Sequence, residues 1–561
     1  MEMTGGIGGG EHAGQTARSA GRKGIGARPA AALVFALSLA MHLPFLGMTP
    51  MAGTEGHRIL PAHEMVRSGW WAVPMLFGKP FMTKPPLHLW LIASSEVIAG
   101  RGNVLVWRLP SAIAGALLCA AACLFGARWF GRTAGLISGV CCVGLITLWG
   151  QSQVADIDAT NTLAAAICAL CEIELLIVQP RKAWPWVLGA GLSLGATLLT
   201  KGPGGLPIIL GVWLWGGCIL IARRQSVLLL RDILVPLLIG GAIFGVYVWF
   251  ARQSLARHHV VPDLSGVQEG ASRLYATSLA ILAKTLLTIP TQLLAFGIPV
   301  SLALPAYLSG RLREQIPPAA RPVATAIVGS VLIALAICVL SGMDNPRYGY
   351  PVLIPLCPLA GALAVAASRT VDGAKPLRAV ASGTAIAYVI VAAALSVSAW
   401  RISHSRTQLP ILIASTSFAL IATVWMLPRL ARSWNAAWAF VPLIWLISVP
   451  FGIQRSVDRS NTSGFHAAAD LRRIVGPAGS IAAGNAVISK PEIFYYANIP
   501  VEFYSDHKTF VPGRIAPGQW VVLDTLERKR WLGEPGVHLE HEQWLCRNAS
   551  TDYYVAWYGE K

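Results

Sequence analysis

The 561-residue sequence is poor in charged side chains, and acidic residues are the scarcer kind, with 27 Asp and Glu against 45 Lys and Arg. Charged residues make up 13% of the chain, about half of the roughly 25% found in soluble domains. Apolar residues make up 54%. This balance excludes an ordinary soluble domain and indicates a polytopic membrane protein. The net charge of +18 is scattered in short groups between apolar runs, so we expect no nucleic-acid partner.

The sequence also lacks the Cys and His spacings that are typical of structural metal sites. All the cysteines except Cys546 lie inside apolar runs, and we interpret them as small buried side chains. Nucleotide-binding fingerprints are missing as well. "TKGPGG" (200–205) does not have the spacing of a P-loop, and "GLSLG" (191–195) is a helix-packing pattern.

Long apolar runs are abundant. Since about 20 residues span a bilayer, we predict thirteen membrane helices, at 30–48, 107–127, 132–150, 158–178, 185–200, 203–222, 232–251, 281–308, 321–341, 349–368, 379–399, 409–427 and 435–452. The first is interpreted as a signal-anchor, because so many spans follow it. The predicted fold is therefore an α-helical membrane domain (30–452) that follows a disordered, basic cytoplasmic tail (1–29).

The basic residues indicate the orientation. Lys and Arg gather in the even-numbered connections, so the positive-inside rule places the N-terminus in the cytoplasm. The loops 49–106 and 252–280 and the segment 453–561 would then lie outside the cytoplasm.

The segment 453–561 differs in composition from the rest. It is polar and joins a helical pattern, "GFHAAADLRRIVG", to strand-like runs, which are "SIAAG", "IFYYAN", "VEFY", "QWVVLDT" and "DYYVAWYG". This alternation predicts a small periplasmic α/β domain.

Ionisable residues are concentrated in the 49–106 loop. Thr54 is the expected N-cap of a helix over "EGHRILPAHEMVRSG", despite Pro61 inside it. "KPFMTKPPLHLW" is expected to run extended into Pro85. A second amphipathic helix should begin at Pro86 and lie along the membrane surface.

This loop, "TEGHRILPAHEMVRSGWWAVPMLFGKPFMTKPPLHLWLIA", resembles the first outer loop of GT-C glycosyltransferases of the protein O-mannosyltransferase and aminoarabinose transferase (ArnT-like) superfamily. "WRLPSAIAG" (107–115), "LLTKGPGGLPIIL" (198–210) and "NPRYGYPVLIPLCPLAG" (345–361) fit the same pattern in the same order. The resemblance implies a GT-C fold, glycosyltransferase activity and a sugar donor carried on polyprenyl phosphate.

The resemblance also implies catalytic acids. Glu55 would be the general base, and Asp158, at the outer end of the fourth helix, would be a second acid, although a surface-exposed helix cap is the alternative for Asp158. The sequence departs from the family at Thr54, where relatives usually carry aspartate. It departs again at Thr83, where they often carry glutamate.

Four residues are candidate ligands of the donor phosphate: Lys84, Lys201, Arg347 and Tyr348. Lysine supplies a point charge, whereas arginine can hold two phosphate oxygens. For Lys201 and Arg347, a charged side chain snorkelling from a helix end is the alternative. We assign a supporting role to two neighbours of Glu55, His57 and Arg58.

Whether a divalent metal binds stays open at this stage, and no cofactor is assigned. His258 and His259 are adjacent, but the sequence offers no obvious third ligand beside them.

Together these features predict an inverting glycosyltransferase of the bacterial inner membrane. It would move a sugar from a polyprenyl-phosphate carrier to a periplasmic acceptor, which is lipid A, another lipid, a glycan or a protein. The alternatives are a transporter or lipid flippase, which would bury ionisable residues along helix middles, and a family member without catalysis.

Overall fold

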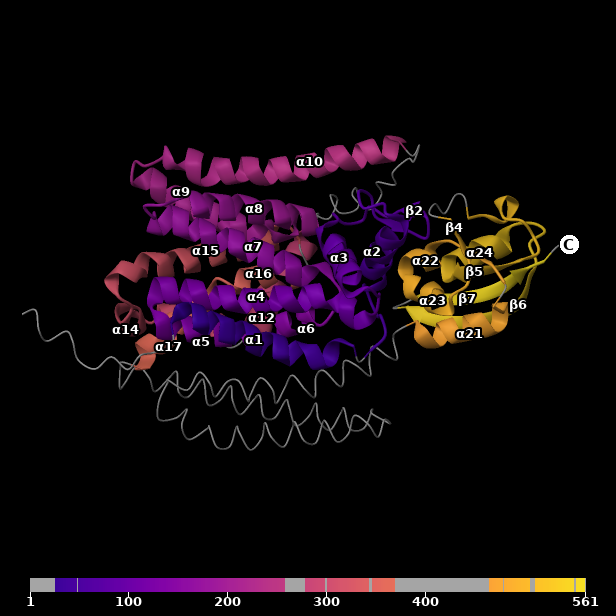
Figure 1. Cartoon of the computed structure of the whole chain (residues 1–561), viewed down its shortest axis with the longest axis horizontal. Helices are drawn as coiled ribbons and strands as arrows, with labels where there is room; N and C mark the ends of the chain where they lie inside the picture. Colours follow the sequence, from indigo (N-terminus) through magenta and orange to yellow (C-terminus); the bar gives the residue numbers. More distant parts are fainter. Residues whose placement is uncertain are drawn as a thin grey trace, which may run out of the picture.

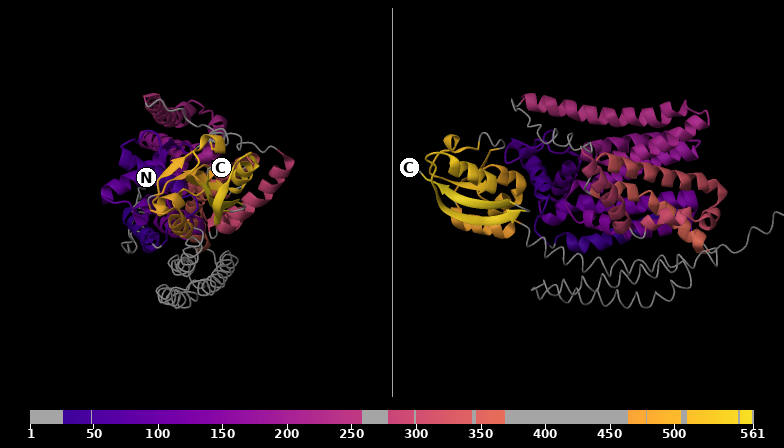
Figure 2. Two further views of the ribbon diagram at one scale, coloured as in Figure 1. Left: turned by 90° about the vertical axis from the view of Figure 1, so that its right-hand side faces the viewer. Right: turned by 180° about the vertical axis from the view of Figure 1, so that it is seen from behind.

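The computed structural model describes residues 26–47, 49–257, 278–297, 300–342, 346–368, 464–477, 479–504, 510–548 and 551–559. These residues form a long bundle of helices with a small mixed α/β unit at one end, and α2 and α3 lie between the two (Figures 1 and 2). The predicted helices 379–399, 409–427 and 435–452 lie outside the described residues.

The bundle is made of mostly apolar helices and the short charged helix α14 (Gly310–Glu314). The apolar helices are α1 (Ala27–Leu46), α4 (Val104–Phe130), α5 (Arg132–Val143), α6 (Ile146–Ser152), α7 (Ile157–Ile173), α8 (Trp184–Lys201), α9 (Leu206–Ala222), α10 (Val235–Arg257), α12 (Leu279–Phe296), α13 (Ala303–Leu308), α15 (Arg321–Leu340), α16 (Tyr350–Leu353) and α17 (Leu356–Ser368). Within the described part of the chain, seven helical stretches are long and apolar enough to cross a membrane. The prediction of a polytopic helical membrane protein is confirmed.

Several predicted spans are divided by glycine or proline. The span predicted at 132–150 is two helices that meet at Gly144, and the one at 281–308 breaks after Gly297. Pro355 separates α16 from α17. Gly202, which adopts a φ of +61° that a side chain would disfavour, turns the chain from α8 into α9 through the 3-10 helix Gly202–Gly205. Both α8 and α9 then pack along α7.

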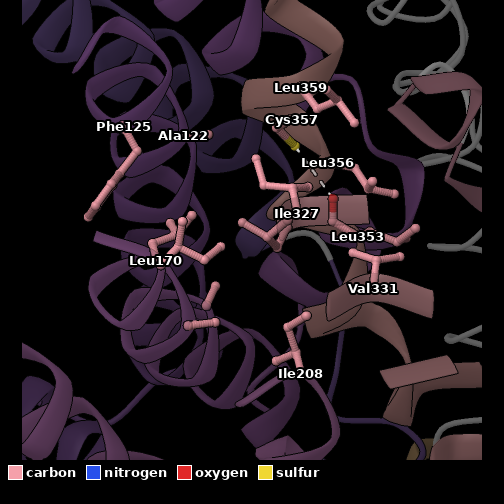
Figure 3. Close-up of a cluster of buried hydrophobic side chains, with 14 of the residues drawn as sticks. Ala122, Phe125, Leu170, Ile208, Ile327, Val331, Leu353, Leu356, Cys357 and Leu359 are labelled. Carbon is pink, nitrogen blue, oxygen red and sulfur yellow. Dashed lines mark hydrogen bonds between the residues drawn. The ribbon is translucent and has the colours of Figure 1, made fainter. Parts of the chain in front are cut away.

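Figure 3 shows the apolar side chains that close the bundle core. Sticks drawn there include Ala122, Phe125, Leu170, Ile208, Ile327, Val331, Leu353, Leu356, Cys357 and Leu359, from α4, α7, α9, α15, α16 and α17. The Cys357 thiol donates a weak hydrogen bond to the Leu353 carbonyl (3.9 Å). All ten cysteines are free, and those in apolar runs are buried as predicted, with one exception. Cys218 on α9 is exposed, so burial was the wrong expectation for it.

The C-terminal unit contains a five-stranded sheet. Its elements are α21 (Phe465–Val475), β3 (Ile481–Ala483), α22 (Asn485–Ser489), α23 (Pro491–Ala497), β4 (Val501–Phe503), β5 (Gln519–Asp524), α24 (Thr525–Gly533), β6 (Leu539–Asn548) and β7 (Thr551–Tyr558). The strand order is β4-β3-β5-β7-β6. β3 runs parallel to β4 and β5, whereas β7 runs antiparallel to β5 and β6.

One prediction for this unit was wrong. "IFYYAN" was expected to be a strand, but it lies in helix α23. Pro491 occupies the first turn, where its missing N–H costs nothing, and Ile493, Phe494 and Ala497 share the buried face. β6 was not predicted, whereas the strands at "SIAAG", "VEFY", "QWVVLDT" and "DYYVAWYG" and the helix at "GFHAAADLRRIVG" are confirmed.

The two helices expected in the 49–106 loop are confirmed as α2 (Gly56–Ser68) and α3 (Leu87–Ala99). A short hairpin of β1 (Met75–Leu76) and β2 (Lys79–Pro80) joins them. Thr54 does not cap α2, contrary to expectation. Glu55 occupies the cap position without a capping side chain, because the Thr54 hydroxyl donates instead to Asp156.

Alternation of helix direction brings distant segments to one end of the bundle. α1 ends and α4 begins beside α2, and α7 begins where α6 ends. α8 returns to that end at Lys201, and the 3-10 helix Pro346–Tyr348 follows α15 there. Segments that lie as far apart in the sequence as about positions 50 and 350 therefore meet at the end of the bundle next to the C-terminal unit (Figure 1).

Candidate functional site

Glu55 lies in a closed ion pair with Arg108, whose side chain comes from the first turns of α4. Nε and Nη2 of Arg108 each donate to a different Glu55 oxygen at 2.7 Å. The main-chain N–H groups of Ala155 (2.8 Å) and Ala52 (3.2 Å) donate to the same carboxylate. Glu55 is 1% exposed and Arg108 is 0% exposed. We call Glu55, Arg108 and these two amides the clamp.

Arg108 uses its remaining donors to hold the chain before α2. Nη1 donates to the carbonyls of Leu46 and Thr49 and to the Thr49 hydroxyl, and Nη2 donates to the carbonyl of Pro50. A buried guanidinium is tolerated only when its donors are satisfied. The clamp therefore joins the end of α1, the turn before α2 and the residue that precedes Asp156.

Asp156, the N-cap of α7, is also buried (6% exposed). Its Oδ1 accepts from Arg58 Nε (3.2 Å) and from the Ile157 amide (2.8 Å), and its Oδ2 accepts from the Thr54 hydroxyl (2.6 Å). Burial by itself would raise the pKa of Asp156, but Arg58 and these hydrogen bonds outweigh it and hold that pKa well below its usual range. Thr54 is exposed, so its hydroxyl lies between the surface and a hidden carboxylate.

Asp158, in the first turn of α7, faces the end of α8 and the 3-10 helix Pro346–Tyr348. Its Oδ1 pairs with the Lys201 ammonium, and its Oδ2 lies 3.9 Å from Arg347 Nη1. The Lys201 ammonium also lies over the Tyr348 ring, 4.4 Å from the centroid. Arg347 keeps 41% of its side chain exposed. The Asp158 carboxylate is thus in direct contact with Lys201 and lies farther from Arg347.

Lys84, in the turn before α3, is half-buried among like charges. Burial lowers its pKa, and Arg58, Lys201 and Arg347 lower it further, while Asp156 opposes them. Within the described residues, Lys84 makes no ion pair with a carboxylate. We call Arg58, Lys84, Lys201 and Arg347 the cation cluster.

Two other predictions concern histidines and a metal. His57 stacks on Phe81, with centroids 5.7 Å apart and planes at 14°, at the edge of this region. Among the residues that the structure describes, no group of three or more His, Cys, Asp or Glu side chains is arranged to hold a metal ion. His258 and His259 lie outside the described residues.

The structure therefore brings the predicted site residues together, from segments far apart in the sequence. It adds Arg108 and Asp156, to which the sequence assigned no role, and Thr54, which was expected only to cap a helix. The signals were present, because Arg108 lies in the "WRLP" block and Asp156 precedes Asp158 by two residues. What the sequence could not show is which carboxylate each cation faces.

Comparisons with known proteins bear on the family and on the fold. Residues 83–249 match the family model for dolichyl-phosphate-mannose-protein mannosyltransferase. That range includes the "KPPL" and "TKGP" blocks on which the resemblance was based, and the predicted resemblance is confirmed. No curated protein sequence matches the chain.

Two similar solved structures are those of ArnT from Cupriavidus metallidurans. The structure bound to undecaprenyl phosphate has a TM-score of 0.67 at 16% identity, and covers 93% of this chain and 97% of that one. The apo structure has a TM-score of 0.63 at 16% identity, with the same coverage. At this identity the likeness establishes the fold, which is the predicted GT-C fold with its C-terminal unit.

Proposed function

We propose that this chain, which has the GT-C fold and carries a segment of the dolichyl-phosphate-mannose-protein mannosyltransferase family, transfers a sugar from a polyprenyl-phosphate carrier to an envelope acceptor. The acceptor is a lipid, a glycan or a protein that presents a nucleophilic oxygen. The orientation inferred from the basic residues puts the reaction on the periplasmic face of the bacterial inner membrane.

The position of Lys84 among like charges carries this proposal. Lys84 makes no ion pair with a carboxylate within the described residues, and Arg58, Lys201 and Arg347 all lie close enough to lower its pKa. Like charges that crowd together are costly unless an anion joins them. A phosphodiester or phosphomonoester at Lys84 would supply that anion. The ArnT structure named above was determined with undecaprenyl phosphate, which is a ligand of this chemical class.

In the proposed reaction the acceptor oxygen attacks the anomeric carbon as the bond from that carbon to the phosphate oxygen breaks. The attack from the opposite face inverts the configuration. The electron pair leaves with the polyprenyl phosphate, whose developing charge is stabilised by Lys84, Lys201 and Arg347.

The acceptor proton needs a base within reach. An acceptor hydroxyl can donate to Oγ1 of the exposed Thr54 while the Thr54 proton passes to Oδ2 of Asp156, because that contact already exists at 2.6 Å. This relay gives Asp156 the part of general base, which the resemblance implied for Glu55. If the acceptor is a phosphate, it is already ionised and the same groups only orient it.

Glu55 has a different part in this proposal from the one predicted. Both of its oxygens accept hydrogen bonds within the clamp, so a substrate proton would have to displace Arg108 or an amide. We therefore propose Glu55 as the anchor of the turn that carries Thr54. Its role as general base stays a prediction. Asp158 is proposed to hold Lys201 at the site and to offset part of the positive charge that faces the donor phosphate.

Replacing Lys84 tests the proposal. The purified chain in nanodiscs, with a polyprenyl-phosphate sugar as donor and envelope lipids as acceptors, should transfer sugar, as followed by mass spectrometry. Lys84→Met should raise the KM for the donor about 10- to 100-fold, since a charge-assisted phosphate contact is lost. Lys79→Met, an exposed lysine on β2 of the same loop, is the matched control and should behave as wild type.

The rival functions predict other outcomes. A flippase would translocate a lipid-linked sugar between leaflets without forming a glycosidic bond. A member without catalysis would bind polyprenyl phosphate through Lys84 yet transfer nothing from any donor. Equal KM values for Lys84→Met and Lys79→Met would contradict the phosphate site itself.

A further inference from the structure

Helix α23 of the C-terminal unit packs on the chain just before α2, mainly through one face. The Met51 amide donates to the Tyr496 hydroxyl at 2.6 Å. Tyr495, one residue earlier, meets the rings of His63 on α2 (6.0 Å) and Trp107 on α4 (6.2 Å), both edge to face. Pro491 and Glu492, one turn earlier, reach Gly56. The spacing is that of a single helix face.

Gly56 is the closest point of this contact. A Cβ at position 56 would lie 2.9 Å from Pro491 Cγ and 3.0 Å from a Glu492 carboxylate oxygen, distances that real Cβ atoms rarely show. Gly56 is the residue directly after Glu55, so α23 touches the main chain at the clamp.

Glu492 is a carboxyl group with little to hold it in ionised form. It is 0% exposed, and neither of its oxygens has a hydrogen-bond partner within the described residues. Lys490 Nζ is its nearest cation, at 3.6 Å. Burial raises the pKa of Glu492 to about 7, with Lys490 opposing this and the Glu55 carboxylate adding to it. Cys546 on β6 is the other titratable group that interacts with it.

We infer that α23 is a positioning element of the transfer site: Pro491, Glu492 and Tyr496 hold the 51–56 turn so that Thr54 stays against Asp156. This inference deepens the proposed function and rests on it. The C-terminal unit then acts on the reaction through the turn, without touching the donor.

The geometry explains why a second restraint is needed. Arg108 ties the carbonyls of Leu46, Thr49 and Pro50, and the amide of Ala52 donates to Glu55. The Met51 amide, between them, is satisfied by Tyr496. The turn is thus restrained from two sides. The bundle holds its carbonyl groups through Arg108, and α23 holds it through the Met51 amide and the contact at Gly56. A displacement of about 1 Å at Thr54 would break the 2.6 Å contact with Asp156.

The test uses the full chain in nanodiscs and two pairs of variants. Tyr496→Phe removes the acceptor of the Met51 amide, and its control is Tyr504→Phe, whose hydroxyl bonds Glu502 on the surface. Gly56→Ala forces α23 away, and its control is Gly513→Ala, where a Cβ would meet nothing within 4 Å. Hydrogen exchange of peptides covering 49–56 and steady-state kinetics are measured for each.

Both site variants should exchange amides of the 49–56 segment at least tenfold faster than their controls. Their kcat should fall about tenfold or more while KM for the donor stays within a factor of about three, because the cation cluster is untouched. A variant that merely unfolds would lose donor binding too. Unchanged exchange, or faster exchange with wild-type kcat, would overturn the inference. If the wild type transfers no sugar, the proposed function fails on its own, and the exchange data still decide whether α23 restrains the turn.

Discussion

The clamp and the cation cluster lie side by side, yet they differ in how deeply their charged groups are buried and in how these groups are paired. In the clamp, one guanidinium and one carboxylate are fully buried and every donor is used within the protein. In the cluster, Lys84 makes no ion pair within the described residues and is crowded by three other cations, and Arg347 is partly exposed. A closed, buried pair holds a chain in place, whereas a half-buried lysine among like charges is suited to bind an anion from outside.

Breaking the clamp should have the largest effect. Arg108→Met leaves Glu55 buried without its partner, and removing one member of a buried pair costs about 3–5 kcal/mol of stability. Thermal unfolding in nanodiscs should show this loss for Arg108→Met. Because the double variant Arg108→Met, Glu55→Leu removes both charges, it should recover part of the loss. A double variant less stable than Arg108→Met would mean that the pair does not behave as a unit.

Removing the buried carboxylate of Asp156 should have the next largest effect, and this effect should be on the rate of transfer. Asp156→Asn should lower kcat about 100-fold or more, in the range of a lost general base. Thr54→Val should lower it to a similar degree, because it interrupts the same relay, whereas Thr54→Ser should keep most of the activity. Single-turnover transfer measures these rates. Activity in Thr54→Val equal to that of wild type would exclude the relay.

Making the cluster more positive should have a smaller effect, which is an increase in its affinity for the lipid phosphate. Asp158→Asn removes the negative charge that pairs with Lys201, so polyprenyl phosphate should bind about 3- to 10-fold more tightly and inhibit more strongly as product. Equilibrium binding of the lipid phosphate, compared between the variant and wild type, measures the change. Weaker binding would indicate that Asp158 positions Lys201 more than it neutralises its charge.

The last effect is on the pH dependence of stability, and it arises from the Glu492 carboxyl group next to the clamp. The pKa of Glu492 is about 7 in the folded chain against 4.5 when unperturbed. Between these values the folded state holds a proton that the unfolded state loses. Stability should therefore be full below about pH 4.5 and fall as pH rises through 7, by about 1–3 kcal/mol at most. Glu492→Gln should remove this decline, seen as a smaller loss of unfolding temperature between pH 5.5 and 8.

The difference between the two regions also explains what the sequence could reveal. Apolar runs predicted the spans because hydrophobicity is set by composition, and "KPPL" and "TKGP" placed Lys84 and Lys201 at the site. The sequence could not show which acid has both oxygens occupied by hydrogen bonds inside the protein and which one can be reached by a substrate proton. Glu55 and Asp156 are both acids near helix starts, and only the fold shows that Arg108 encloses the first while an exposed hydroxyl covers the second.

The error at "IFYYAN" has a similar origin. Tyrosine, phenylalanine and isoleucine favour strands on average, but Pro491 and the burial of Ile493, Phe494 and Ala497 on one face favour a helix here. That burial is a tertiary effect, so the local pattern missed both the helix and the contact that its opposite face makes with Gly56.

The close approach at Gly56 has an evolutionary consequence. A residue larger than glycine at this position can be accommodated only if α23 loses bulk where Pro491 and Glu492 now lie. Among homologues that keep the C-terminal unit docked, the two positions should therefore vary together, with a side chain at 56 paired to a smaller residue at 491 or 492. Homologues lacking this unit should be free of that constraint, so an alignment divided by its presence would reveal whether the contact is under selection.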